Sequence, residues 1–132
     1  GCDDSKQARP QSGKAKGEKQ GTLYYFDGHG RAEFLRLMLI HSGINWEDKR
    51  LSNEEWGGLK PTFPPGGLPC WVDKDIKLNE TNALARFLAK KLGYHPTQAK
   101  AAWDVDATFD FLFEQWGKMA GTTVMGKDDQ ES

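Results

Sequence analysis

The chain contains few cysteines and no long apolar run. Of its 132 residues, only Cys2 and Cys70 are cysteines, and they lie far apart in the sequence. This argues against a scaffold held together by disulfides and favours a reducing compartment. No stretch approaches the roughly 18 consecutive apolar residues that a membrane-spanning helix requires. We therefore expect a cytoplasmic protein.

An excess of charge of one sign is also missing. The formal net charge is -1, with 28% of the residues charged, so the composition gives no reason to expect a nucleic-acid partner. The three histidines, His29, His41 and His95, do not have the spacing of a metal site, and we expect no metal. The length suffices for one domain of ordinary size with its own core.

The N-terminal segment differs in composition from the rest of the chain. Residues 1–20 contain no aromatic or branched aliphatic residue and cannot bury enough apolar surface to offset the entropy of ordering, so we expect a flexible basic tail over residues 1–21. If an initiator methionine once preceded Gly1, the tail fits the pattern for N-myristoylation, with Cys2 as a palmitoylation site and nearby lysines facing anionic lipid. A glycine added in cloning is the alternative explanation.

The hydrophobic pattern predicts alternating strands and helices. Short apolar runs bounded by turn residues are typical of strands, and apolar positions three and four residues apart are typical of helices. We expect strands at 23–26 and 44–51, a helix over 32–42, a loop over 52–67, a hairpin within 68–80, and helices over 81–92 and 102–116. This order predicts a small mixed sheet with helices on its faces, followed by an additional helix.

Four stretches of the sequence carry a family resemblance. They are "LYYFDGHGRAEFLRLML", "EEWGGLKP", "GGLPCWV" and "LNETNALARFLAKKLGY". In this order they resemble the N-terminal thioredoxin-like domain of the cytosolic glutathione transferases, closest to the tyrosine-type, sigma-like class. The resemblance implies an α/β fold, a thioredoxin-like mixed sheet with flanking helices. It also implies a glutathione-binding domain over residues 22–95 and, over residues 96–132, the start of a truncated all-helical C-terminal domain.

The resemblance implies a catalytic role for Tyr25, which matches the family's tyrosine at the end of the first strand. Its hydroxyl would donate a hydrogen bond to the sulfur of glutathione. Lowering a thiol pKa from about 8.5 by two units requires roughly 2.7 kcal/mol, and one hydrogen bond to a charged acceptor supplies about 1.5 to 3 kcal/mol. The alternative for Tyr25 is an ordinary half-buried aromatic residue of a strand.

The other residues implied by the resemblance would bind glutathione as a substrate. The Leu68–Pro69 bond matches a cis-proline turn whose main chain pairs with the cysteinyl part, although Gly67 replaces a side chain that helps to hold the peptide in many relatives. The remaining matches are Glu80 and Thr81 for the γ-glutamyl end, Trp56 and Lys60 for the glycyl end, and Arg31 and Asp110 near the site. For Arg31 and Asp110 an ordinary surface charge is the alternative, and for Thr81 a simple helix cap.

Two hypotheses for function follow. The first is a glutathione transferase-like domain that binds glutathione as co-substrate and activates its thiol for transfer to a small electrophile. The second is a noncatalytic binding or structural subunit of the same fold, in a larger assembly that an acylated tail would hold at a membrane. The apolar face of the last helix would be covered in a homodimer or by another protein partner.

Overall fold

The structure, a computed structural model, describes residues 17–121. Gly1 and Cys2 therefore lie outside the described residues, and their acylation stays a prediction. The chain divides into two compact units, residues 1–92 and 93–132. Among the described residues, no helix combines the length and the apolarity needed to cross a membrane.

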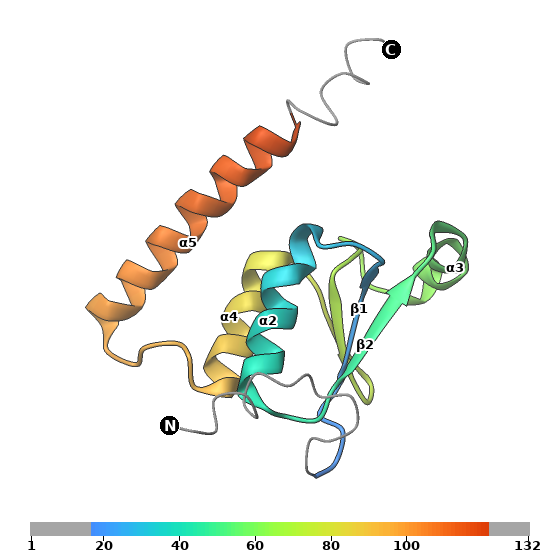
Figure 1. Cartoon of the computed structure of the whole chain (residues 1–132), viewed down its shortest axis with the longest axis horizontal. Coiled ribbons are helices and arrows are strands. Elements are labelled where there is room, and N and C mark those ends of the chain that lie inside the picture. The colour runs from blue at the N-terminus through green and yellow to red at the C-terminus, as the bar shows by residue number, and fades with distance from the viewer. Residues whose placement is uncertain (1–16, 122–132) are drawn as a thin grey trace, which may run out of the picture. The chain divides into compact units, whose positions relative to one another are not determined.

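The first unit contains a four-stranded mixed sheet, drawn in Figure 1. The strand order is β2-β1-β3-β4. β1 pairs in parallel with β2, whereas β3 pairs antiparallel with both β1 and β4. The strands are β1 (Thr22–Phe26), β2 (Glu47–Leu51), β3 (Cys70–Asp73) and β4 (Ile76–Leu78). The predicted strands and the predicted hairpin are confirmed.

This topology brings four separate segments to one end of the sheet. The parallel strands β1 and β2 both end there, and the antiparallel strand β3 begins there. β4 runs back against β3 and ends there too. The segments after β1, β2 and β4 and the segment before β3 therefore converge, and these segments, with their short helices, contain most of the residues that the family resemblance assigned to glutathione.

Two helices of the first unit pack beside each other on one face of the sheet, as Figure 1 shows. These are α2 (Glu33–Ser42) and α4 (Thr81–Leu92), and a short 3-10 turn, η1 (Gly30–Ala32), precedes α2. The helix α2 ends at Gly43, whose φ of 79° is in the left-handed region that glycine adopts readily at the end of a helix. The core between helices and sheet is apolar and includes Leu23, Leu35, Leu39, Trp71, Leu84 and Leu88.

The expected loop over residues 52–67 is wrong in its first part. Residues Asn53–Leu59 form helix α3, and Lys60–Thr62 form the 3-10 turn η2. A capping box starts α3: Glu55 N–H donates to Ser52 Oγ at 3.0 Å, and Ser52 N–H donates to the Glu55 carboxylate at 2.9 Å. These reciprocal bonds satisfy main-chain donors of the first turn and allow a helix despite two glycines inside it.

The second unit contains one long helix, α5 (Ala99–Ala120), which extends beyond both ends of the predicted 102–116 pattern. Gln98 caps it by accepting a hydrogen bond from Ala101 N–H at 2.8 Å. Before the helix, His95 Nε2 lies 3.0 Å from Asp106 Oδ1 and ties the preceding turn to α5. Several large apolar side chains of α5 are exposed: Trp103, Val105, Phe111, Leu112, Trp116 and Met119.

Candidate functional site

Tyr25 lies at the end of β1, where the chain turns toward α2. Its side chain is half-buried, and its hydroxyl oxygen accepts a hydrogen bond from Arg31 N–H at 3.1 Å. A phenol that accepts a main-chain N–H still has its own proton to donate. Tyr24 points to the opposite face of the strand, where its ring meets the edge of Phe63 at a centroid distance of 5.2 Å.

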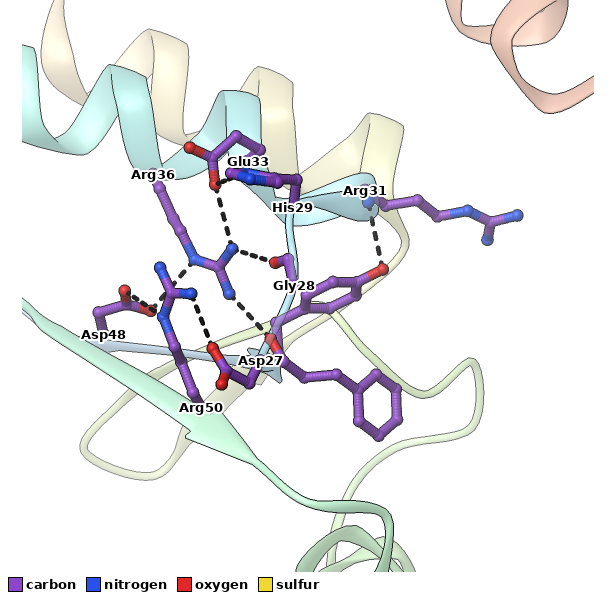
Figure 2. Close-up of polar contacts among 10 residues, drawn as sticks. Asp27, Gly28, His29, Arg31, Glu33, Arg36, Asp48 and Arg50 are labelled. Atoms are coloured by element: carbon purple, nitrogen blue, oxygen red, sulfur yellow. Dashed lines mark hydrogen bonds and ion pairs between the residues drawn. The ribbon is translucent and has the colours of Figure 1, made fainter. Parts of the chain in front are cut away.

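A buried arginine on α2 holds the turn that follows Tyr25. Arg36, whose side chain is 2% exposed, lies at the centre of the contacts in Figure 2. Its Nη1 donates to Gly28 O and its Nη2 to Phe26 O at 3.1 Å. Its Nε donates to Asp48 Oδ1 on β2 at 3.2 Å. The guanidinium also lies 5.6 Å from the centroid of the Tyr25 ring.

Carboxylates surround this arginine and extend the network to the surface. Burial raises the pKa of Glu33, but hydrogen bonds from Arg36 and His29 outweigh it and hold the Glu33 pKa below its usual value. Arg50 donates to Asp48 and to Asp27, both at 3.0 Å, and these hydrogen bonds raise its pKa further. The network thus joins the end of β1, β2 and the start of α2.

The sequence analysis did not identify Arg36 as important. A signal was present, because Arg36 follows Ala32 by four residues and precedes Leu39 by three, which places it on the buried stripe of the helix. A charge at such a position indicates a buried ion pair.

The Leu68–Pro69 peptide bond is cis, as the resemblance implied. Pro69 is buried, and the ladder between β1 and β3 ends at the Tyr24–Cys70 pair. Tyr25 follows Tyr24 on β1 and Pro69 directly precedes Cys70 at the start of β3, so Tyr25 and the main chain of Leu68 lie at the same end of the sheet. Their relation to glutathione remains a prediction.

Glu80 and Thr81 lie at the start of α4. The first main-chain bond of this helix runs from Leu84 N–H to Glu80 O at 2.8 Å, so the amide groups of its first turn precede the helical ladder. Glu80 has a φ of 66°, and its carboxylate lies beside Gly66, where a β-carbon would be 2.7 Å from Glu80 Oε2. The structure thus brings Glu80 next to the loop that leads to Leu68.

Trp56 and Lys60 follow β2, on α3 and at the start of η2. The Trp56 ring is half-buried and meets the edge of Phe63 at a centroid distance of 5.3 Å. A β-carbon at Gly67 would lie 3.9 Å from the Trp56 ring, so Trp56 borders the same loop as Glu80. Lys60 is exposed.

The side chains of Arg31 and Asp110 are not brought into this cluster by any described contact. The Arg31 main chain holds Tyr25, whereas the Arg31 side chain is exposed and extends away from the Arg36 network in Figure 2. Asp110 is an exposed residue of α5, which belongs to the second unit. Its role at the site stays a prediction.

The Cys70 side chain does not supply a reactive thiol to this site. Cys70 is fully buried on β3, and burial raises the pKa of its thiol to about 11, which makes it a poor nucleophile. Within residues 17–121, no group of three or more histidine, cysteine, aspartate or glutamate residues is arranged to hold a metal ion.

Comparison with known proteins identifies the family. A family model described as the N-terminal domain of glutathione S-transferase matches residues 19–90. The S-crystallin SL11 of Nototodarus sloanii is 34% identical over 94 residues, which cover 70% of this chain and 46% of that protein. Glutathione S-transferase 3 of Caenorhabditis elegans is 31% identical over 111 residues, covering 82% of this chain and 54% of that protein.

A solved structure agrees with these matches. The Pi-class glutathione S-transferase of Onchocerca volvulus superposes with a TM-score of 0.76 at 26% identity, covering 83% of this chain and 52% of that one. The chain thus spans about half the length of these relatives. The thioredoxin-like fold is confirmed, and the chain belongs to the glutathione S-transferase family.

Proposed function

We propose that this chain binds glutathione and activates its thiol for transfer to a small electrophile. The observation that carries the proposal is the hydrogen bond from Arg31 N–H to the Tyr25 hydroxyl, 3.1 Å long. It fixes the position of the oxygen at the converging end of the sheet and leaves the phenol proton to donate. Family membership supports the same function.

The free energy needed to lower the thiol pKa is close to what one hydrogen bond from Tyr25 can supply. Ionising a thiol of pKa about 8.5 at neutral pH requires a shift of roughly two units, or about 2.7 kcal/mol. A hydrogen bond to a charged acceptor contributes about 1.5 to 3 kcal/mol. The N-terminal end of α2, which follows the Tyr25 turn, adds a smaller favourable potential.

The remaining groups would hold the peptide in an extended form. The main chain of Leu68 would pair with the cysteinyl residue as an added strand, and the start of α4 at Glu80 and Thr81 would hold the γ-glutamyl carboxylate. Lys60 would face the glycyl carboxylate, with Trp56 covering it. Arg31 would lie near the site, and Asp110 would lie near the site or the dimer cleft.

The apolar side chains on α5 support a second part of the proposal, which concerns partners. Trp103, Phe111 and Met119 are each more than 60% exposed, and apolar faces of this kind are normally covered. We expect a homodimer, in which a second copy covers part of this helix. Sedimentation of the purified chain tests this expectation.

Replacing the Tyr25 hydroxyl tests the catalytic proposal. Tyr25→Phe should keep glutathione affinity within about threefold while raising the thiol pKa of bound glutathione by one to two units, so that conjugation of an aryl halide near pH 6.5 slows by about 5- to 50-fold. The rate difference should shrink as the pH approaches 8.5. Tyr24→Phe, which removes the neighbouring hydroxyl on the opposite face, should leave the rate unchanged.

Two results would contradict the proposal in different ways. If the wild-type chain is retained on immobilised glutathione but does not accelerate conjugation, the chain is a noncatalytic binding module. If the wild-type chain is not retained at all, the peptide site itself is absent.

A further inference from the structure

Side chains at the end of β4 contact the segment between α3 and the cis Leu68–Pro69 bond. Residues 63–67 form no helix or strand, although they lead directly into Leu68. Asn79, the residue after β4, points its side-chain amide at this segment. Asn79 Nδ2 donates to Pro65 O at 2.7 Å and lies 3.3 Å from Pro64 O and 3.5 Å from Gly67 O.

The Asn79 side-chain amide therefore contacts the main-chain carbonyls of three loop residues. An Asn NH₂ has two protons to donate, and the bond to Pro65 O is the shortest of the three contacts. At Gly66, a β-carbon would lie 2.9 Å from Asn79 Nδ2 and 2.7 Å from Glu80 Oε2, and the φ of Gly66 is +111°. A side chain at Gly66 would therefore displace the Asn79 amide or the Glu80 carboxylate, and its backbone would be strained at this φ.

A lysine two residues earlier holds the preceding part of the same segment. Lys77 Nζ donates to Thr62 O at 2.7 Å and lies 4.9 Å from the centroid of the Phe63 ring. The Phe63 ring in turn meets the edge of the Trp56 ring. Lys77 and Asn79 leave the same face of the strand, and we call these two residues the β4 clamp.

We propose that Asn79 is a positioning residue of the glutathione site, an inference that rests on the proposed function. The β4 clamp fixes the loop between Lys60 and Leu68, so that the groups assigned to the glycyl and cysteinyl parts stand in place before the peptide arrives. Without it, binding must also order the loop, and affinity falls by that cost. Tyr25 is on β1, outside the clamped loop, so its chemistry on bound glutathione is unaffected.

Replacing Asn79 by alanine tests this inference. Asn79→Ala should raise the Kd for glutathione, measured by calorimetry, by about tenfold, or 1.4 kcal/mol. The conjugation rate at saturating glutathione should stay within about twofold of wild type, and amide hydrogen exchange over residues 62–68 should accelerate in the free protein. Asn45→Ala is the matched control, because Asn45 Nδ2 also donates to a main-chain carbonyl, Gly17 O at 3.0 Å, but at the opposite end of β2.

A second variant, Lys77→Met, tests the inference even if Asn79→Ala does not fold. Lys77→Met keeps a long apolar stem but removes the bond to Thr62, and it should weaken glutathione binding in the same way. If the wild-type chain binds glutathione and both variants have the same Kd as the wild type, the inference is wrong while the proposed function stands. The inference is also wrong if the rate at saturating glutathione falls while the Kd is unchanged. A wild-type chain that does not bind glutathione refutes the proposed function and this inference with it.

Discussion

Replacing Arg36 by methionine should destabilise the first unit far more than the same change at Arg50. Arg36 is 2% exposed, whereas Arg50 is 41% exposed. Removing one partner of a buried ion pair typically costs 3 to 5 kcal/mol. Methionine keeps the apolar stem of the side chain, so the variant tests the polar contacts rather than a cavity.

The contacts of Arg36 place the cost near the lower end of this range. Asp48 keeps its bond to Arg50, and Glu33 keeps His29 and is partly exposed, so both carboxylates retain partners or reach water. The carbonyl of Gly28 loses the Arg36 donor, but Gly28 is exposed and this carbonyl can bond to water, while that of Phe26 still accepts from Gly28 N–H. The cost therefore comes mainly from the lost charge pairing of the buried guanidinium, at about 3 kcal/mol.

Urea unfolding measures this difference. Trp46 and Trp71 are buried in the same unit as Arg36, so their fluorescence reports its unfolding. With a urea slope of about 1.5 kcal/mol per molar, the midpoint of Arg36→Met should fall by roughly 2 M. Arg50→Met removes an exposed pair and should cost less than about 1 kcal/mol. Equal midpoints for the two variants would refute the conclusion that Arg36 organises the turn after β1.

Three further outcomes follow from the structure. Because burial raises the Cys70 pKa to about 11, iodoacetamide at pH 8 should leave the Cys70 peptide unmodified in the native protein and alkylate it in urea, as peptide masses will report. The folded pKa of Glu33 is lowered, so its contribution to stability is present above the unfolded value of 4.5 and is lost as the pH falls through the folded value. Glu33→Gln should therefore flatten the loss of urea stability between pH 5 and pH 3, and an unchanged acid profile contradicts this. Gly30→Ala would force a β-carbon against the Tyr25 hydroxyl at a φ of +41°, so conjugation should slow with little change in glutathione affinity.

Much of the fold could be predicted because its signals are local. A helix is indicated by apolar residues three and four positions apart and by a glycine after its last turn, and a strand by a short apolar run between turn residues. Each of these signals depends only on neighbouring residues in the sequence. The helix α3 was missed although its capping box, Ser52 to Glu55, can be read from the sequence, because the glycines and prolines after it suggested a loop. The apolar spacing of residues 81–92 would place Phe87 beside Leu84 and Leu88, but Phe87 is 42% exposed, whereas Ala85 is buried.

The site was predictable only where the family resemblance named a residue. The cis Leu68–Pro69 bond and the place of Tyr25 at the end of β1 agree with it. No hydrophobic pattern would have identified either of them, because an X–Pro bond is usually trans and most strand tyrosines have no catalytic role. Tyr25 and the Leu68–Pro69 bond lie at the same end of the sheet because β1 and β3 are antiparallel. The order of the strands in the sequence does not fix whether they pair in parallel or antiparallel.

The two residues that the sequence analysis missed share a physical cause. Arg36 and Asn79 each donate to main-chain carbonyls of residues at least eight positions away. Every residue has a carbonyl, so the acceptor leaves no mark in the sequence, and the donor is recognised only when the fold shows what surrounds it. Such donors act on loops and on the ends of strands, such as Phe26 at the end of β1, because carbonyls in the middle of helices and sheets are already paired. The carbonyls that accept from Arg36 and Asn79 lie in such segments of the candidate site. The residues that hold these segments are therefore the hardest ones to predict from the sequence.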